Sequence, residues 1–253
     1  MRLIRGCVRF ALIFFVIAPV LFALRVLIWP SVLLSRPFDR RASRYLLWLW
    51  SSAFRRIAGI RVVVRGTPPK PPCFVVANHV SYIDMLLLTN LSGCIFVSRG
   101  DVERWPVIGF VSKSIYVIFI DRNNKRDTVR VNKLIDEAFK EGDGIAVFAE
   151  SRISRGLDVE PFKSSLIAPA VANHLPVHYT TIMYETLPGM PPANEIVGWW
   201  RPESFFYHLF RLLGYPGFTA ILHFGDAPIA GDDRKELADK LWRAVRANFI
   251  PIK

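Results

Sequence analysis

The sequence predicts an α/β fold, with a layered, mixed sheet flanked by helices and preceded by helices that associate with a membrane. Two observations support this prediction. From residue 61 onward, short apolar runs typical of strands alternate with segments of helical periodicity. Residues 1–60 are instead apolar and rich in arginine. Hydrophobic residues make up 52% of the 253 residues, so the chain can bury a sizeable core and is not disordered.

The basic charge lies at the N-terminal end. Residues 1–60 hold ten arginines and a single acid, Asp39, whereas the rest of the chain holds 23 basic and 20 acidic residues. Positive charge and apolar character in one segment favour the surface of an anionic membrane bilayer as a partner. A nucleic acid would need the same charge on a polar surface, so we expect no nucleic-acid partner.

The first candidate element is the unbroken apolar run Phe10–Leu24, which Arg25 separates from a second apolar stretch, Val26–Leu34. A full membrane span needs about 20 apolar residues, and a re-entrant or interfacial helix with bends at Pro19 and Pro30 fits equally well. A cleaved signal peptide should end at a small-residue site, yet the apolar character continues past any such site. We therefore expect a membrane anchor, and both a full span and a shallow insertion into the bilayer fit the sequence. If it spans, the arginines before it favour a cytoplasmic N-terminus. We expect the protein to be membrane-associated, at the cytoplasmic face of the inner (plasma) membrane.

The second candidate element is a helix over Arg41–Ala58, which contains neither proline nor glycine. Aromatic and apolar residues fill its middle and arginines gather at its ends, as in helices that lie in a membrane interface. A core helix of the globular part is the alternative. Residues 1–60 therefore form the predicted anchoring region, and residues 61–253 form the predicted globular domain.

In the globular part, the predicted strands and helices alternate along the chain. The predicted strands are residues 61–65, 73–77, 94–98, 115–120, 144–149, 177–184 and 218–224. The predicted helices are residues 81–91, 128–140, 162–174 and 234–249. The proline-rich stretch 187–198 is predicted to be an irregular loop.

The most informative segment is Asn78–Asp84, where polar residues appear as soon as a strand ends. Ser81 followed by Asp84 resembles a capping box, which would start a helix at Ser81 and leave His79 in the loop before it. In one continuous helix, residues five apart would point about 140° away from each other. The Asp84 carboxylate can therefore reach the His79 imidazole only because the helix starts at Ser81 and does not include His79.

A carboxylate bonded to one ring nitrogen of a histidine fixes the tautomer and leaves the other nitrogen free to take a proton. His79 and Asp84 therefore predict a general base that acts directly on a substrate hydroxyl, with no protein nucleophile. The alternative is an ordinary histidine beside a helix-capping aspartate.

The same residues resemble the HX4D motif of the glycerolipid acyltransferases, in particular the lysophosphatidic acid acyltransferase (1-acylglycerol-3-phosphate O-acyltransferase) family. Further segments resemble this family's blocks in the same order. They are residues 96–102 with 106–109, residues 118–122, residues 147–156, residues 161–163 and residues 175–179. One block departs from the family pattern, because its Pro-Glu-Gly-Thr reads Ala149-Glu150-Ser151-Arg152 here, and Ile153 stands where an arginine is usual.

The resemblance implies an acyltransferase that moves a fatty acyl group from an acyl-ACP or acyl-CoA thioester to the free hydroxyl of 1-acyl-glycerol-3-phosphate, giving phosphatidic acid. The altered block motivates an alternative acceptor, another lysolipid such as lyso-ornithine lipid. The acyl carrier protein or coenzyme A thioester and the lysophospholipid acceptor are thus the expected partners. No cofactor and no metal are expected.

The resemblance also implies roles for individual residues. His79 would be the general base, Asp84 would orient it, and Glu150 would help to position the acceptor or the loop around it. Backbone N–H groups near the helix start at Ser81, or around Glu150, would bind the oxyanion of the tetrahedral intermediate. The residues expected to bind the anionic head group are Arg99, Arg152, Arg155 and Lys163.

Overall fold

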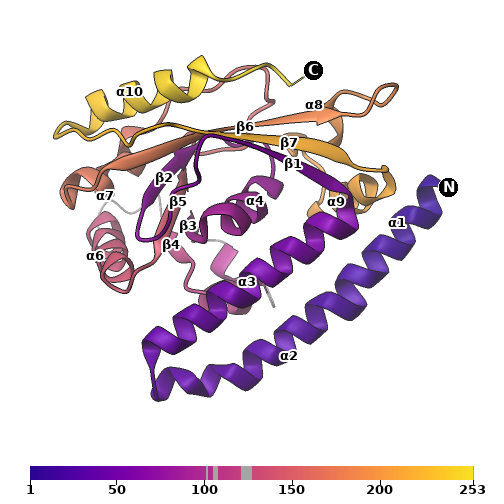
Figure 1. The fold of residues 1–253 in the computed structure, drawn as a ribbon, viewed down its shortest axis with the longest axis horizontal. Coiled ribbons are helices and arrows are strands. Elements are labelled where there is room, and N and C mark those ends of the chain that lie inside the picture. Colours follow the sequence, from indigo (N-terminus) through magenta and orange to yellow (C-terminus); the bar gives the residue numbers. More distant parts are fainter. Residues whose placement is uncertain (101, 105–107, 121–126, 253) are drawn as a thin grey trace.

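The computed structural model describes residues 1–100, 102–104, 108–120 and 127–252, and it confirms the α/β prediction (Figure 1). Within these residues, seven strands form one mixed sheet in the order β1-β7-β6-β2-β5-β3-β4. Strands β6 and β7 run antiparallel, and the other neighbouring strands are parallel. The strands are β1 (Ile60–Arg65), β2 (Phe74–Ala77), β3 (Cys94–Arg99), β4 (Ile118–Ile120), β5 (Gly144–Phe148), β6 (Val177–Thr186) and β7 (Phe218–Phe224).

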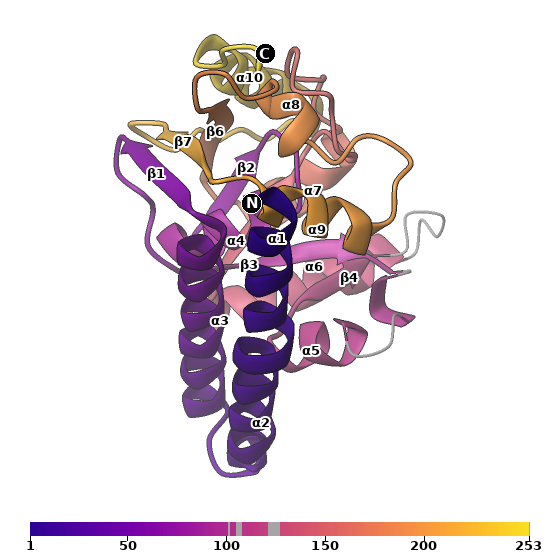
Figure 2. The ribbon, with the colours of Figure 1, turned by 90° about the vertical axis from the view of Figure 1, so that its right-hand side faces the viewer.

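Two groups of helices pack on opposite faces of the sheet (Figures 1 and 2). Successive side chains of a strand point to opposite faces, so in β2 Phe74 and Val76 pack with one group, whereas Val75 and Ala77 pack with the other. The first group is α6 (Asp127–Lys140), α7 (Ser164–Ala172) and α10 (Arg234–Ala247). The second is α3 (Arg36–Ala58), α4 (Ile83–Ser92), α8 (Ala193–Ile196) and α9 (Phe205–Gly214).

Three helices were not predicted from the sequence: α5 (Ile108–Ser114), α8 and α9. Short α8 lies inside the stretch that we expected to be an irregular loop. Helix α9 is rich in apolar residues, and its buried residues His208, Leu209, Leu212 and Leu213 recur at the spacing of one helix face. Ser204 caps α9 by accepting a hydrogen bond from the Tyr207 N–H at 3.3 Å.

The N-terminal residues form a helical hairpin with α3 (Figure 2). Its first arm is a continuous helical run, Arg2–Leu33, made of α1 (Arg2–Ala11), a π-helical segment (Leu12–Ile17), α2 (Ala18–Ile28) and a 3-10 turn (Trp29–Leu33). By length and composition this run could cross a membrane, since its most apolar window has a mean hydropathy of 2.7 and is 11% buried. Pro19 lies at the start of α2, directly after the π-helical segment, and does not end the run.

Several arginines of the hairpin contact the protein itself. Arg25 is buried and pairs with Asp39 at 2.7 Å, and it also donates to the Ser114 carbonyl at 2.8 Å. Arg9 donates to the carbonyls of Tyr215 and Pro216, just beyond α9, at 2.6 and 3.0 Å. Part of the N-terminal charge therefore holds the hairpin to the sheet domain.

Candidate active site

The predicted catalytic residues meet at one edge of the sheet. Strands β2 and β5 are parallel neighbours, and their register pairs Ala77 with Phe148. His79 and Glu150 each follow two residues later, so they leave the carboxyl ends of adjacent parallel strands at the same level. This is the edge at which open α/β sheets bind ligands.

His79 and Asp84 form the predicted pair. His79 Nδ1 lies 2.8 Å from Asp84 Oδ2. With a carboxylate as its partner, Nδ1 carries the proton, and Nε2 is the nitrogen that can accept one. Among the residues that the structure describes, Nε2 has no hydrogen-bond partner, and the His79 side chain is 14% exposed.

The chain breaks before α4 as predicted, but the helix begins later. Its N-cap residue is Tyr82 instead of Ser81. Asp84 Oδ2 accepts hydrogen bonds from the N–H groups of Val80 and Ser81 at 2.7 and 2.9 Å, which is one half of a capping box. The Ser81 hydroxyl instead accepts from the Ile83 N–H at 3.4 Å.

Ser81 is completely buried, and Asp84 already occupies its N–H. The structure therefore directs this N–H toward Asp84, whereas the sequence led us to expect that it would bind an oxyanion.

An aromatic wall lies beside the imidazole. The His79 ring stacks on Phe148 with centroids 3.9 Å apart and an angle of 11° between planes. Phe148 in turn stacks on Phe96 at 5.7 Å. The Ser154 N–H donates to the His79 carbonyl at 2.7 Å and fixes the backbone. The imidazole is thus held in one orientation with an apolar surface along its face.

Glu150 contacts the backbone of His79. Its Oε1 accepts a hydrogen bond from the His79 N–H at 3.1 Å. Its Oε2 is buried and has no hydrogen-bond partner among the described residues. Burial raises the pKa of the Glu150 carboxyl to about 8, although hydrogen bonds from the His79 N–H and the Ser154 hydroxyl oppose this shift. At neutral pH the carboxyl therefore carries a proton for most of the time.

Two of the predicted head-group residues, Arg152 and Lys163, lie at the surface. The Arg152 guanidinium is 71% exposed and makes two 2.8 Å hydrogen bonds to Glu160. The Lys163 side chain is exposed. The backbone N–H of Lys163 donates to the Ala149 carbonyl at 2.8 Å. Arg99 ends β3, but its side chain lies outside the described part of the structure.

Arg155 lies near the His79 loop, in an exposed cationic cluster. Its guanidinium lies 4.2 Å from the centre of the Trp200 ring, and that of Arg201 lies 4.9 Å from the same ring. Two backbone hydrogen bonds attach this cluster to the site. Ser154, next to Arg155, donates to His79, and Trp199, next to Trp200, donates to the Val80 carbonyl at 3.1 Å.

Some residues of the blocks that resemble the family lie outside the described residues. They are Asp101, Pro106, Val107, Asp121 and Arg122.

Three contacts of the site were not predicted from the sequence. Phe148 stacks on the imidazole, and Tyr184 binds Asp84 through its hydroxyl group. The Asn78 amide closes the loop against β6, donating to the Ile182 carbonyl at 2.9 Å and accepting from its N–H at 2.7 Å. Only Asn78 gave a signal in the sequence, as a polar residue that directly follows a buried strand.

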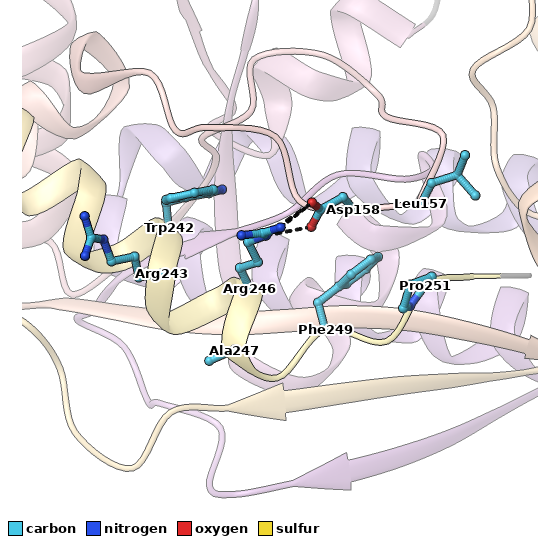
Figure 3. A pocket seen from close by; sticks show the side chains of 8 residues that line it. All are labelled: Leu157, Asp158, Trp242, Arg243, Arg246, Ala247, Phe249 and Pro251. Carbon is cyan, nitrogen blue, oxygen red and sulfur yellow. Dashed lines mark hydrogen bonds and ion pairs between the residues drawn. The ribbon is translucent and has the colours of Figure 1, made fainter.

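A cavity of about 480 Å³ lies elsewhere, between α10 and the segment after Glu150 (Figure 3). The Arg246 side chain crosses it to pair with Asp158 at 2.8 Å. Its lining residues are Leu157, Asp158, Trp242, Arg243, Arg246, Ala247, Phe249 and Pro251. None of the predicted site residues lines it.

Comparison with known proteins gives consistent relatives. The Acyltransferase family profile matches residues 60–184, which include His79, Asp84 and Glu150. A lyso-ornithine lipid O-acyltransferase of Rhodobacter capsulatus is 31% identical over 200 residues, covering 76% of this chain and 71% of the relative. A lyso-ornithine lipid O-acyltransferase of Pseudomonas aeruginosa is 30% identical, and the match covers 83% of this chain and 79% of the relative. A 1-acyl-sn-glycerol-3-phosphate acyltransferase of Neisseria meningitidis is 29% identical, and the match covers 73% of this chain and 72% of the relative.

A solved structure shares the fold along nearly the whole chain. It is the 1-acyl-sn-glycerophosphate (LPA) acyltransferase PlsC of Thermotoga maritima, which superposes with a TM-score of 0.72 at 21% identity, covering 98% of this chain and 95% of that one. At this identity the likeness concerns the fold alone. The family is shown by the matching profile and by the two relatives of at least 30% identity. The chain belongs to the Acyltransferase family, and the protein is an acyltransferase enzyme.

Proposed function

We propose that this protein transfers a fatty acyl group from an acyl-carrier-protein or coenzyme A thioester to the free hydroxyl of a lysolipid, with His79 as the general base. The observation that carries the proposal is the 2.8 Å contact between His79 Nδ1 and Asp84 Oδ2, which leaves Nε2 without a partner among the described residues. A base of this kind must lie within hydrogen-bond reach of the proton that it removes.

The proposed reaction needs no acyl-enzyme intermediate. His79 Nε2 takes the proton of the acceptor hydroxyl while the hydroxyl oxygen attacks the thioester carbonyl. Asp84 stabilises the imidazolium that forms. The tetrahedral intermediate then collapses, its C–S bond breaks, and the proton on Nε2 returns to the departing thiolate. The products are an ester and a free thiol.

Two acceptors compete for the proposal. The resemblance of the motifs favours 1-acyl-glycerol-3-phosphate, and the Neisseria relative bears the corresponding name. Lyso-ornithine lipid is supported by the Rhodobacter and Pseudomonas relatives and by the altered block around Ser151 and Ile153. In both cases we assign the anionic part of the head group to Arg155, which forms no ion pair among the described residues and lies beside the His79 loop.

We also propose that the protein works at a bilayer surface, where lysolipid acceptors reside. The run Arg2–Leu33 leaves large apolar side chains exposed, including Phe15 and Leu27 at 76% each. Helix α9 continues this surface with Phe206 and Tyr207, which are 55% and 61% exposed. Phe14 and Phe206 contact each other at 5.8 Å and join the two helices.

The experiment supplies the purified full chain with acyl-carrier-protein and coenzyme A thioesters and with each acceptor in turn. The products are identified by mass spectrometry. We expect His79→Ala to lower kcat by about 100-fold to 10,000-fold, the usual contribution of a general base. The matched control is His174→Ala, since His174 is exposed at the end of α7. An active His79→Ala variant would exclude the proposed base, and an inactive wild type on both acceptors would exclude the proposed substrates.

A further inference from the structure

Asp84 has a second side-chain partner. The Tyr184 hydroxyl donates a hydrogen bond to Asp84 Oδ1, whereas His79 contacts Oδ2. Tyr184 lies near the end of β6, 100 residues further along the chain, and only 2% of it is exposed. The two ends of the carboxylate are thus held by side chains from two different elements.

The Tyr184 ring is fixed by its own packing. It belongs to the core on the α4 face of the sheet and meets Phe218 of β7 edge to face at 5.8 Å. Strand β6, which carries Tyr184, is anchored to the loop before α4 through the two Asn78–Ile182 hydrogen bonds. A tyrosine held in this way has little freedom, so its hydroxyl defines where Oδ1 must lie.

The hydroxyl also supplies a donor that the carboxylate requires. Asp84 is completely buried, and a buried carboxylate is stable only when hydrogen bonds replace its lost hydration. The N–H groups of Val80 and Ser81 and the His79 ring all bind Oδ2. Among the described residues, Tyr184 is the donor that serves Oδ1. Burial raises the pKa of Tyr184 well above 10, so this group remains a donor throughout the range in which the enzyme could be assayed.

We infer that Tyr184 is a positioning residue for the reaction, which orients the Asp84 carboxylate so that Oδ2 faces His79 Nδ1. The inference rests on the proposed function for its kinetic consequence. Tyr184 does not touch substrate in this scheme, and it acts through Asp84 and then through the imidazole.

The test is Tyr184→Phe, which removes one oxygen and keeps the ring. We expect kcat to fall about tenfold at unchanged KM, in keeping with the loss of one hydrogen bond to a charged group. We also expect the acidic limb of the pH–rate profile to move to lower pH. Without this donor the Asp84 carboxylate is no longer held with Oδ2 facing Nδ1, so it stabilises the imidazolium less. The other titratable groups close to the pair, Glu150 and Tyr82, are the same in both proteins, so the difference between the two profiles reports Tyr184.

Tyr179→Phe is the matched control, since Tyr179 lies on the same strand and its hydroxyl has no hydrogen bond among the described residues. A double-mutant cycle separates positioning from general stability. In an Asp84→Asn background, Tyr184→Phe should cause no further loss of activity. An additional tenfold loss there, or an unchanged kcat and pH profile in the single variant, would overturn the inference.

A third measurement needs no turnover. Nitrogen-15 NMR of the His79 ring in the full chain reports which nitrogen carries the proton, and we expect the fraction protonated at Nδ1 to fall in Tyr184→Phe. If the wild type is inactive on both acceptors, the proposed function fails, but this spectrum still decides the inference. An unchanged tautomer population would reject it.

Discussion

Two buried carboxyl groups near His79 differ in how fully they are hydrogen-bonded. Asp84 receives bonds on both oxygens, from two backbone N–H groups, the imidazole and Tyr184. Glu150 receives one backbone N–H bond, on Oε1, and its Oε2 has no partner among the described residues. Burial disfavours the charged form of a carboxyl unless hydrogen bonds compensate. This difference fits an aspartate that stabilises an imidazolium beside a glutamic acid that is mostly neutral at pH 7.

The raised pKa of Glu150 predicts a pH-dependent stability. Its folded-state pKa of about 8 lies above the ordinary value of 4.5, so between these values the folded protein keeps a proton that the unfolded chain releases. The contribution of Glu150 is therefore fully present below pH 4.5 and is lost as the pH rises through 8. Glutamine keeps an oxygen for the His79 N–H and does not titrate.

We expect the free energy of unfolding of the wild type to fall, relative to that of Glu150→Gln, by about 1 kcal/mol per pH unit within this window. Thermal unfolding of the full chain in detergent between pH 5 and pH 9 measures this difference. Glu160→Gln serves as the control, because Glu160 is half-buried and paired with Arg152. Parallel curves for wild type and Glu150→Gln would contradict the prediction.

At the scale of single elements, the end of α7 shows a conformation that its sequence disfavours. His174 follows the C-cap residue Asn173 and has a φ of 50°, in the left-handed region. The Leu175 N–H bonds to the Ala170 carbonyl at 2.8 Å and the His174 N–H to that of Val171 at 3.1 Å, the two bonds of a Schellman motif. Glycine is the usual residue at this position because it has no Cβ to strain.

The substitution His174→Gly should therefore stabilise the protein by about 0.5–1 kcal/mol, even though glycine costs entropy in the unfolded chain. His174→Ala keeps a Cβ atom at the same position and should bring no such gain. Thermal or denaturant unfolding of the full chain compares the two variants. Equal stability of the glycine and alanine variants would show that the left-handed backbone costs little here.

At the scale of the whole molecule, the hairpin and α9 form one apolar surface although they are about 200 residues apart in sequence. Phe10 contacts Phe210 at 5.9 Å and Phe14 contacts Phe206 at 5.8 Å. The first residue of α9, Phe205, packs on Tyr82, the N-cap residue of α4, with ring centroids 4.9 Å apart. A bilayer that covered this surface would therefore lie close to the site.

This arrangement predicts that α9 contributes to membrane binding together with the hairpin. Replacing Phe206 and Tyr207 by serine should weaken binding of the full chain to vesicles of phosphatidylcholine and phosphatidylglycerol by about tenfold or more, because two aromatic contacts are lost. The control replaces two exposed apolar residues elsewhere, Val129 and Leu187, by serine. Vesicle flotation measures both. Equal binding of the two double variants would exclude α9 from the membrane contact.

The sequence by itself determined the local features of this protein. Short apolar runs marked the seven strands found in the described residues, and the turn before α4 indicated that His79 and Asp84 could meet. These features depend on neighbours within a few residues, where the chain's own geometry limits the outcome.

Only the tertiary structure decided which distant residues complete the site. Tyr184 reaches Asp84 from 100 residues away, and Phe148 faces His79 because β5 is the parallel neighbour of β2. Strand order and register follow from the packing of the whole core, and a single sequence does not state them. The same holds for Arg9 and Arg25. They belong to the basic segment whose overall charge predicted an anionic bilayer, and the fold directs them to its own carbonyl and carboxylate groups.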